Sequence, residues 1–351
     1  MKINYACPIL SSDEAREIEK SLLVDVVAEW SAMEAAGKGI AAGILRDFQE
    51  LQALPDAPRV LVLVGKGHNG GDALLAAAEI MARHPRSKVW CLLTSERDAM
   101  KALTLRALES VEGRVQLETL GSEGDTELLE RLDDLSGGKG FDICLDGLLG
   151  LSFRPPLDER LSNLVQAVND YAQIGLRAAV DMPTGLGGAD SSISFVVDFT
   201  YATGSVKKMH LDGGQACGRV RWVDLGFFEQ GEAKASNEYF LKDAILNPLR
   251  QLRPSMVDKR TFGHLFIVGG SSNMPGALLM SVQAAVRSGV GLVTAFAPQS
   301  VAASLAAQVP EAMWIPWPES GNGTLSPRAL PLLMQRLPAA TAVLVGPGMG
   351  R

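Results

Sequence analysis

The sequence predicts an α/β protein whose first and larger unit is a doubly wound, mostly parallel sheet. Between residues 60 and 223, short apolar runs typical of buried strands alternate with longer segments of helical periodicity. This alternation is typical of a parallel sheet with helices on both faces. A glycine-rich turn at 65–71 joins the first such strand to a helix. The length of 351 residues suits about two domains.

The elements of the first unit follow one another in a regular order. Residues 12–50 carry apolar positions at helical spacing with acidic residues opposite, which predicts two helices. Strands are expected at 60–64, 88–93, 141–149, 178–181, 198–203 and 219–223, and helices from residue 72, near 97–110 and near 158–172. Residues 227–261 lack a clear period, so we divide the chain into domains 1–228 and 229–351.

A second, shorter α/β unit follows this boundary. A strand at 264–268, a tight turn at 269–271, a helix at 277–286 and strands at 292–296 and 342–345 are expected. The sequence ends at Arg351 inside a glycine loop, directly after the last of these strands. We therefore expect the second unit to be an incomplete domain.

Composition excludes several classes of protein. The formal net charge of −7 provides no basic surface for nucleic acid or anionic lipid. The N-terminal residues do not resemble a signal peptide, and no apolar run approaches the roughly 20 residues of a membrane span. Four cysteines lie far apart and are expected to be buried thiols. We expect a cytoplasmic protein and leave open whether it forms a homo-oligomer.

The glycine-rich turn carries the first candidate site. Residues 65–72, Gly-Lys-Gly-His-Asn-Gly-Gly-Asp, fit the G-x-G-x-x-G pattern of a Rossmann-like nucleotide site, where backbone N–H groups approach a pyrophosphate. The same residues also suit a tight turn without a ligand. A dehydrogenase interpretation meets a difficulty, because Asp72 is expected in the first helical turn and would compete with a phosphate. The second strand also lacks an acidic residue at its end for a ribose hydroxyl.

Two aspartates follow later strands. Asp146 and Asp181 each come after an apolar run and precede glycine- or proline-containing turns. Carboxyl ends of parallel strands form the ligand crevice of such sheets, although each aspartate could instead cap the turn that follows. Three strand ends with polar residues favour a site, and oxygen ligands of this kind suit a group-1 or group-2 cation better than zinc.

Together, these motifs resemble the NAD(P)H-hydrate epimerase family over about residues 10–228. The motifs are 65–72, Asp146-Gly-Leu-Leu-Gly-Leu-Ser-Phe-Arg-Pro and Asp181-Met-Pro-Thr-Gly, with Met33-Glu-Ala-Ala-Gly before them and Gly218-Arg-Val-Arg-Trp-Val-Asp-Leu-Gly after them. The resemblance implies a potassium ion held by Asn69, Asp146 and Thr184. It also implies substrate contacts from His68, Asn69, Gly70, Gly71, Asp72, Gly150, Leu151, Ser152, Phe153, Arg154, Pro155, Pro156 and Asp181.

This sequence departs from the family pattern at three positions. His68 and Ala35 stand where the family usually has Asn, and Thr184 replaces the commoner Ser while keeping a hydroxyl. A histidine at 68 could still donate to a substrate or could lower its affinity, and as a lone loop histidine it could simply be exposed.

The second unit resembles the opening half of the ADP-dependent NAD(P)H-hydrate dehydratase, a ribokinase-like domain. The matching stretches are 263–277, 287–294 and 345–350. The resemblance implies substrate contacts at Ala277 and Gly348, and ADP binding only in a complete domain. The family's later Gly-Thr-Gly-Asp loop has no counterpart here, so we do not expect dehydration by this polypeptide alone.

The sequence therefore predicts an epimerase of hydrated NADH or NADPH (NADHX or NADPHX), with no preference indicated between the two. Inversion at C6 requires a hydroxyl to leave and return, and we expect Asp181 to act as general acid and base. Two alternatives remain open. An NAD-dependent oxidoreductase would change the redox state of an ordinary cofactor, and a non-catalytic binding protein would bind the hydrate without changing its epimer ratio.

Overall fold

The chain folds as two compact units, Met1–Leu249 and Arg250–Arg351. This computed structural model describes residues 5–187, 193–228, 236–250 and 252–350. The predicted boundary after residue 228 borders residues 229–235, which lie outside the described part of the chain. The segment that follows belongs to the first unit, because β9 (Tyr239–Leu241) pairs antiparallel with β1 (Ala6–Pro8).

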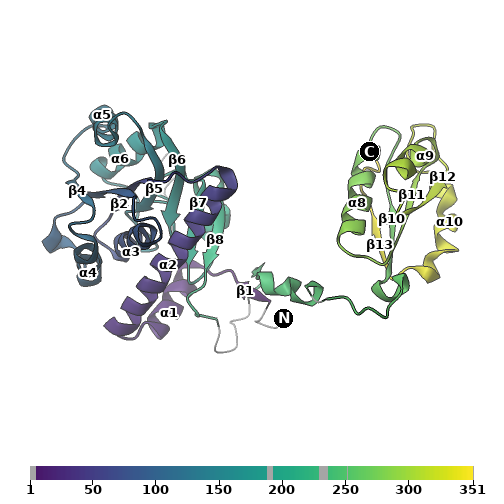
Figure 1. Ribbon diagram of the computed structural model, residues 1–351, viewed down its shortest axis with the longest axis horizontal. Helices are drawn as coiled ribbons and strands as arrows, with labels where there is room; N and C mark the ends of the chain where they lie inside the picture. The colour runs from purple at the N-terminus through teal and green to yellow at the C-terminus, as the bar shows by residue number, and fades with distance from the viewer. Residues whose placement is uncertain (1–4, 188–192, 229–235, 251, 351) are drawn as a thin grey trace. The chain divides into compact units, whose positions relative to one another are not determined.

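The first unit is built on a seven-stranded sheet in which all neighbours are parallel (Figure 1). In spatial order the strands are β4 (Gln116–Thr119), β3 (Lys88–Leu93), β2 (Arg59–Val64), β5 (Phe141–Gly147), β6 (Ile174–Val180), β7 (Phe199–Thr203) and β8 (Arg219–Val223). From β2 the chain moves outward to β3 and β4 and then returns to the opposite side of β2. The sheet is thus doubly wound, with its topological switch point between β2 and β5.

Helices cover both faces of this sheet. The residues of β2 alternate between the two layers, as successive strand residues must. Val60, Val62 and Val64 pack with α2 (Val26–Leu51), α3 (His68–Arg83) and α4 (Ala102–Val111). Leu61 and Leu63 pack with α5 (Asp125–Ser136) and α6 (Glu159–Asp170). The predicted α/β class and the doubly wound arrangement are confirmed.

Two short helices flank this core. Helix α1 (Ser12–Leu22) begins with a capping box in which Ser11 and Glu14 satisfy each other's backbone N–H groups. Helix α7 (Lys208–Asp212) follows the end of β7. The two helices expected within residues 12–50 are therefore present as α1 and α2.

Several predicted elements need correction. Strand β4 and helix α5 were not predicted, because a four-residue edge strand with half-exposed side chains has no continuous apolar run. Strand β5 ends at Gly147, two residues before the predicted end. Helix α3 begins at His68 and not at Asp72, since its first-turn glycines pack closely against neighbouring loops. Asp72 therefore lies beyond the first helical turn.

The second unit contains a four-stranded parallel sheet in the order β12 (Met313–Trp317), β11 (Leu292–Pro298), β10 (His264–Val268) and β13 (Ala342–Val345). Its helices are α8 (Pro275–Arg287), α9 (Gln299–Gln308) and α10 (Leu330–Met334). Helix α9 and strand β12 were not predicted, and the strand is an edge strand that contains Pro316. All four side chains of β13 are exposed.

Two expectations drawn from composition can be compared with the fold. Cys7, Cys91, Cys144 and Cys217 are all free thiols and all buried. Over the described ranges, the chain contains no helix with the length and apolar character needed to cross a membrane.

Candidate functional site

A pocket of about 460 Å³ lies at the switch point of the large sheet. We call it the switch-point pocket. Its walls come from the α1–α2 region, the segment from Lys66 to Asp72, the loop after β5 and the ends of β6 and β7. Ligands of doubly wound sheets bind in this position because the loops leave β2 and β5 in opposite directions there. The loops that carry the predicted motifs therefore meet in one cavity.

Glycines allow the start of α3 to approach the loop after β5. A Cβ atom on Gly65 would lie 1.9 Å from the carbonyl oxygen of Leu148, and one on Gly70 would lie 2.1 Å from that of Gly65. A Cβ on Gly71 would lie 2.7 Å from the sulfur of Met33. Gly70 and Gly71 are thus buried packing positions within α3 and do not line the pocket.

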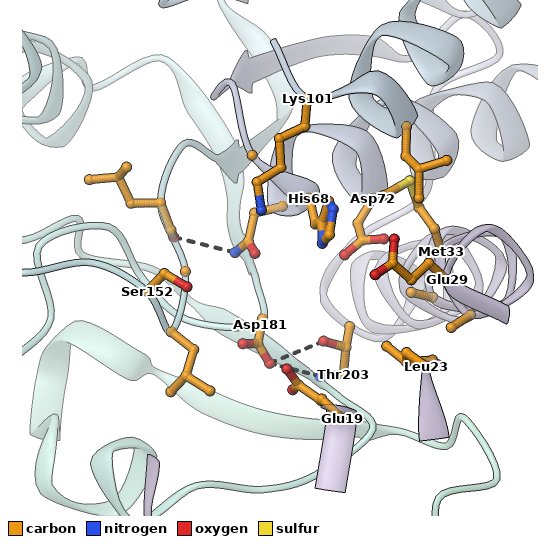
Figure 2. Close-up of a pocket in the computed structure, with 18 of the residues that line it drawn as sticks. Glu19, Leu23, Glu29, Met33, His68, Asp72, Lys101, Ser152, Asp181 and Thr203 are labelled. Atoms are coloured by element: carbon orange, nitrogen blue, oxygen red, sulfur yellow. Dashed lines mark hydrogen bonds between the residues drawn. The ribbon is translucent and has the colours of Figure 1, made fainter. Parts of the chain in front are cut away.

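The N-terminus of α3 is suited to bind an anion. Gly67 is the N-cap residue and makes no side-chain cap, so first-turn N–H groups remain available to a ligand. Lys66 and Lys101 line the same side of the pocket, and Figure 2 shows the Lys101 side chain pointing into it beside His68. Burial, and secondarily the charge of Lys101, lowers the pKa of His68. His68 is half-buried and lines the pocket, which excludes the simple exposed-loop interpretation.

The three predicted potassium ligands come together beside the pocket. Asp146 is 1% exposed, and its Oδ1 accepts hydrogen bonds from the Thr184 hydroxyl at 2.8 Å and from Leu148 N–H at 3.1 Å. The side-chain amide of Asn69 donates to the carbonyl oxygen of Val180 at 2.9 Å. Burial raises the pKa of Asp146 to about 6, although its hydrogen bonds with Thr184 and Leu148 oppose the rise.

The donor set at this cluster consists of oxygen atoms and fits a hard monovalent cation. Asp146 is a buried carboxyl that forms no ion pair with any cationic side chain among the described residues. Within those same ranges, no group of three or more His, Cys, Asp and Glu side chains is placed to hold a metal ion. The cluster is therefore unsuited to a transition metal such as zinc.

Asp181 occupies a strained and highly organised position after β6. Its φ angle is +61°, in the left-handed region that residues other than glycine rarely adopt. Its Oδ1 forms a buried ion pair with Lys207 Nζ and accepts hydrogen bonds from the backbone N–H of Thr203 at 3.2 Å and its hydroxyl at 3.1 Å. His210 Nε2 lies 2.7 Å from the Asp181 carbonyl oxygen. These contacts compensate for the strain.

The same contacts decide the charge of Asp181. Burial alone would raise the pKa of its carboxyl, but the charges of Lys207 and His210 and the hydrogen bonds from Lys207 and Thr203 together outweigh burial. The pKa of Asp181 is therefore lowered, and the group is a carboxylate at neutral pH. Lys207 N–H donates to His210 Nδ1 at 3.1 Å, so the proton of the neutral ring lies on Nε2.

Asp72 has the opposite environment. It is 9% exposed, lines the pocket, and has neither a hydrogen bond to its carboxyl group nor an ion pair among the described residues. Burial, and then the charges of Asp181 and Glu19, raise the pKa of Asp72 well above its usual value. Burial also raises the pKa of Glu19. The pKa values of Asp72 and Asp181 are therefore shifted in opposite directions, and Figure 2 shows both carboxyl groups at the pocket.

The loop after β5 divides into a part that lines the pocket and a part that does not. Gly150 to Phe153 line it, whereas Arg154, Pro155 and Pro156 are exposed and do not. A Cβ on Gly150 would lie 2.4 Å from Asn69 Oδ1, so glycine is required for the Asn69 side chain to lie here. Ala35 is exposed on α2 and is not among the pocket residues.

In the second unit, the structure brings the two predicted dehydratase contacts together. A Cβ on Gly348 would lie 3.0 Å from that of Ala277. Gly270 N–H donates to the Pro347 carbonyl at 2.6 Å, so the loops after β10 and β13 adjoin. Strands β10 and β13 are neighbours, and the chain leaves β10 toward β11 on the other side. This place is the switch point of the small sheet.

Sequence reasoning missed four pocket residues, Glu19, Glu29, Lys66 and Lys101, and also Lys207, which pairs with Asp181. Lys207 lies in the segment that follows the predicted strand 198–203, so the rule that identified Asp146 and Asp181 could have found it. Glu19 and Glu29 alternate with apolar positions on helices, and this pattern indicates only a solvent-facing side.

Comparison with known proteins agrees with this geometry. Residues 30–209 match the family model for the YjeF-related protein N-terminus, and residues 265–351 match that for NAD(P)H-hydrate dehydratase. The chain is 31% identical, over 99% of its length, to a bifunctional NAD(P)H-hydrate repair enzyme of Gloeobacter violaceus and 30% identical, over 91%, to one of Moorella thermoacetica. The matches cover 65% and 59% of those two relatives.

Solved structures are also similar to parts of the chain. The crystal structure of the yeast protein ynu0 covers 55% of this chain and 79% of its own, at 23% identity and a TM-score of 0.45. A ribokinase-like superfamily protein of Enterococcus faecalis covers 33% of this chain and 39% of its own, at 31% identity and a TM-score of 0.27. By the family models and the curated relatives, the chain belongs to the NAD(P)H-hydrate epimerase family and carries a YjeF-related domain followed by part of an NAD(P)H-hydrate dehydratase domain.

Proposed function

We propose that the first unit interconverts the two C6 epimers of hydrated NADH or NADPH in the switch-point pocket. The observation that carries this proposal is the buried carboxylate of Asp181, held ionised by Lys207 at the wall of that pocket. A general base must be ionised at the working pH and must face the reacting group. Asp181 has a lowered pKa and lines the pocket in which the ring would bind.

The chemistry of the hydrated ring suits an acidic pocket. The C6 hydroxyl is bonded to the carbon next to the ring nitrogen, so the nitrogen lone pair can expel it. The C6–O bond breaks, the oxygen takes up a proton and leaves as water, and positive charge develops on N1 and C6. The ionised carboxylate of Asp181 stabilises that charge. Water then adds to the other face of C6 and gives its proton to Asp181.

The remainder of the pocket suits the other end of the substrate. Its anionic phosphates would bind at the α3 N-terminus, near Lys66 and Lys101. The pocket thus has a basic side for phosphates and an acidic side for the ring. This division orients the dinucleotide in one direction.

The cluster of Asn69, Asp146 and Thr184 would hold the potassium ion. When bound, the ion would neutralise the buried Asp146 carboxylate and provide a fixed positive charge near the phosphates. Asn69 lies in the first turn of α3, and Thr184 follows Asp181 by three residues. An ion bound at this cluster would therefore hold the phosphate-binding and proton-transfer segments together.

The test is the rate at which the purified chain interconverts separated C6 epimers of hydrated NADH, measured by chromatography in potassium and in choline chloride. Asp181→Asn should reduce the rate about 10²–10⁴-fold. Asp134→Asn, an exposed position on α5 outside the pocket, is the matched control. An unchanged rate for Asp181→Asn would remove the proton-transfer role from this residue.

Two other functions give different results in the same assay. A binding protein would retain the hydrate in equilibrium dialysis without accelerating the change in epimer ratio. An NAD-dependent oxidoreductase would change nicotinamide absorbance with unmodified cofactor and a substrate. Neither function explains why a pocket carboxylate is paired with a fully buried lysine.

The second unit supports only a related proposal. Its Ala277 and Gly348 adjoin at the switch point of the small sheet, where a hydrated cofactor would bind in a dehydratase domain. The dehydratase model matches residues 265–351 of this unit. The proposal of epimerisation therefore concerns the first unit alone.

A further inference from the structure

Inversion at C6 requires proton transfers on both faces of the ring. This inference rests on the proposed function. The departing oxygen must receive a proton on one face, and the incoming water must lose one on the other. A ring fixed by its phosphates and carboxamide does not turn over between these steps, so one carboxyl group cannot serve both faces. The pocket needs a proton donor in addition to Asp181.

Asp72 has the position and the surroundings of such a donor. It comes from α3, whereas Asp181 follows β6, and Figure 2 shows the two carboxyl groups entering the pocket from different walls. Asp72 is 9% exposed and has no cationic partner among the described residues. Asp181, by contrast, is paired with Lys207. A positive charge thus compensates the carboxylate of Asp181, whereas Asp72 has no such partner among the described residues.

We propose that Asp72 is the proton donor of the epimerisation and acts across the ring from Asp181. In one direction, the O–H proton of Asp72 passes to the C6 hydroxyl oxygen as the C6–O bond breaks, and water leaves. The nitrogen lone pair forms the N1=C6 double bond. Water adds to the face that Asp181 covers, its oxygen bonds to C6, and its proton passes to Asp181. Pocket water then returns that proton to Asp72.

The environment of Asp72 as a whole favours its neutral form. The titratable groups around it are Glu19 on α1, Glu29 on α2, Lys66 and His68 at the start of α3, Lys101 before α4, and Asp181 with Lys207. Lys207 lowers the pKa of Asp72 slightly, but burial and the two acidic neighbours Asp181 and Glu19 outweigh it. Two carboxyl groups whose environments push their pKa values apart are the usual arrangement for an acid and a base in one site.

The test compares Asp72→Asn with the wild type over a range of pH. Asparagine has the same shape and is neutral like the protonated acid, so the fold should tolerate it. Glu79→Gln, further along α3 and outside the pocket, is the matched control. We expect kcat for Asp72→Asn to fall about 10²–10⁴-fold with KM little changed. The decline of the wild-type rate at high pH should also disappear.

A second measurement does not depend on activity. Infrared difference spectra between the wild type and Asp72→Asn at pH 7 should show the loss of a protonated carboxyl band. If the band is absent, Asp72 is ionised and the proposal fails. If the wild type is active and Asp72→Asn keeps both its rate and its high-pH decline, only the assignment of Asp72 is overturned.

Two further outcomes would also overturn it. If Glu19→Gln, and not Asp72→Asn, removes the high-pH decline, the donor is Glu19. If the wild type does not accelerate epimerisation at all, the proposed function itself fails, and this inference fails with it. The pattern of active and inactive variants therefore separates the two failures.

Discussion

Lys207 is the residue whose replacement tests the site most directly. Its side chain is fully buried, and its ammonium group pairs with Asp181 and donates to the Thr203 carbonyl oxygen at 3.2 Å. In Lys207→Met, the methionine fills similar volume but leaves the Asp181 carboxylate buried without a counter-ion. Removing one partner of a buried ion pair typically costs about 3–5 kcal/mol. We expect a loss of this size in the free energy of unfolding of the first unit at pH 7.

The same substitution should change the pH dependence of both stability and activity. Lys207 lowers the pKa of Asp181, so its contribution to stability is present above pH ~4 and is lost as pH falls through the native pKa. The stability difference between wild type and Lys207→Met should therefore be largest at neutral pH and shrink at lower pH. The acid limb of kcat/KM should move to higher pH, because Asp181 then protonates more easily.

The neighbouring lysine provides the control. Lys208 is 53% exposed at its side chain and lies 3.3 Å from Glu238, so Lys208→Met should cost at most about 1 kcal/mol. Because the chain has two units, the stability should be measured by hydrogen exchange on peptides of the first unit, not by a single melting curve. The double variant Lys207→Met/Asp181→Asn should be more stable than Lys207→Met. A loss for Lys207→Met no larger than for Lys208→Met would refute the reasoning.

Three further predictions concern other parts of the pocket. Thr184→Val removes the hydroxyl that donates to Asp146 and that would also bind the potassium ion. In a thermal shift assay, the stabilisation of the protein by potassium chloride relative to choline chloride should therefore disappear. Retained stabilisation would place the ion elsewhere. Gly150→Ala introduces a Cβ 2.4 Å from Asn69 Oδ1, so the Asn69 side chain must shift. The rate of epimerisation, measured by the same chromatography, should fall at least tenfold. An unchanged rate would show that Asn69 can move without loss of activity. Lys101→Met removes a cation near the proposed phosphate site, so KM should rise and the dependence of KM on ionic strength should weaken. An unaltered dependence of KM on salt would exclude Lys101 from phosphate binding.

The hydrophobic periodicity of the sequence was sufficient to predict the central strands of the fold. The buried strands β2, β3 and β5 are continuous apolar runs, because they are covered on both faces, and the pattern predicted them directly. The short edge strands β4 and β12 were missed because half-exposed strands carry no such run. The alternation of strands and helices also predicted the doubly wound class, since parallel strands require crossover connections.

The sequence likewise predicted that strand-end residues such as Asn69, Asp146 and Asp181 belong to one site, because carboxyl ends of parallel strands share an edge. It did not determine their charges. Asp72 and Asp181 are the same residue type, and only the packing of Lys207 against Asp181 and the burial of Asp72 without a partner set their pKa values apart. A pKa depends on distances between groups that are remote in sequence, and those distances exist only in the folded chain.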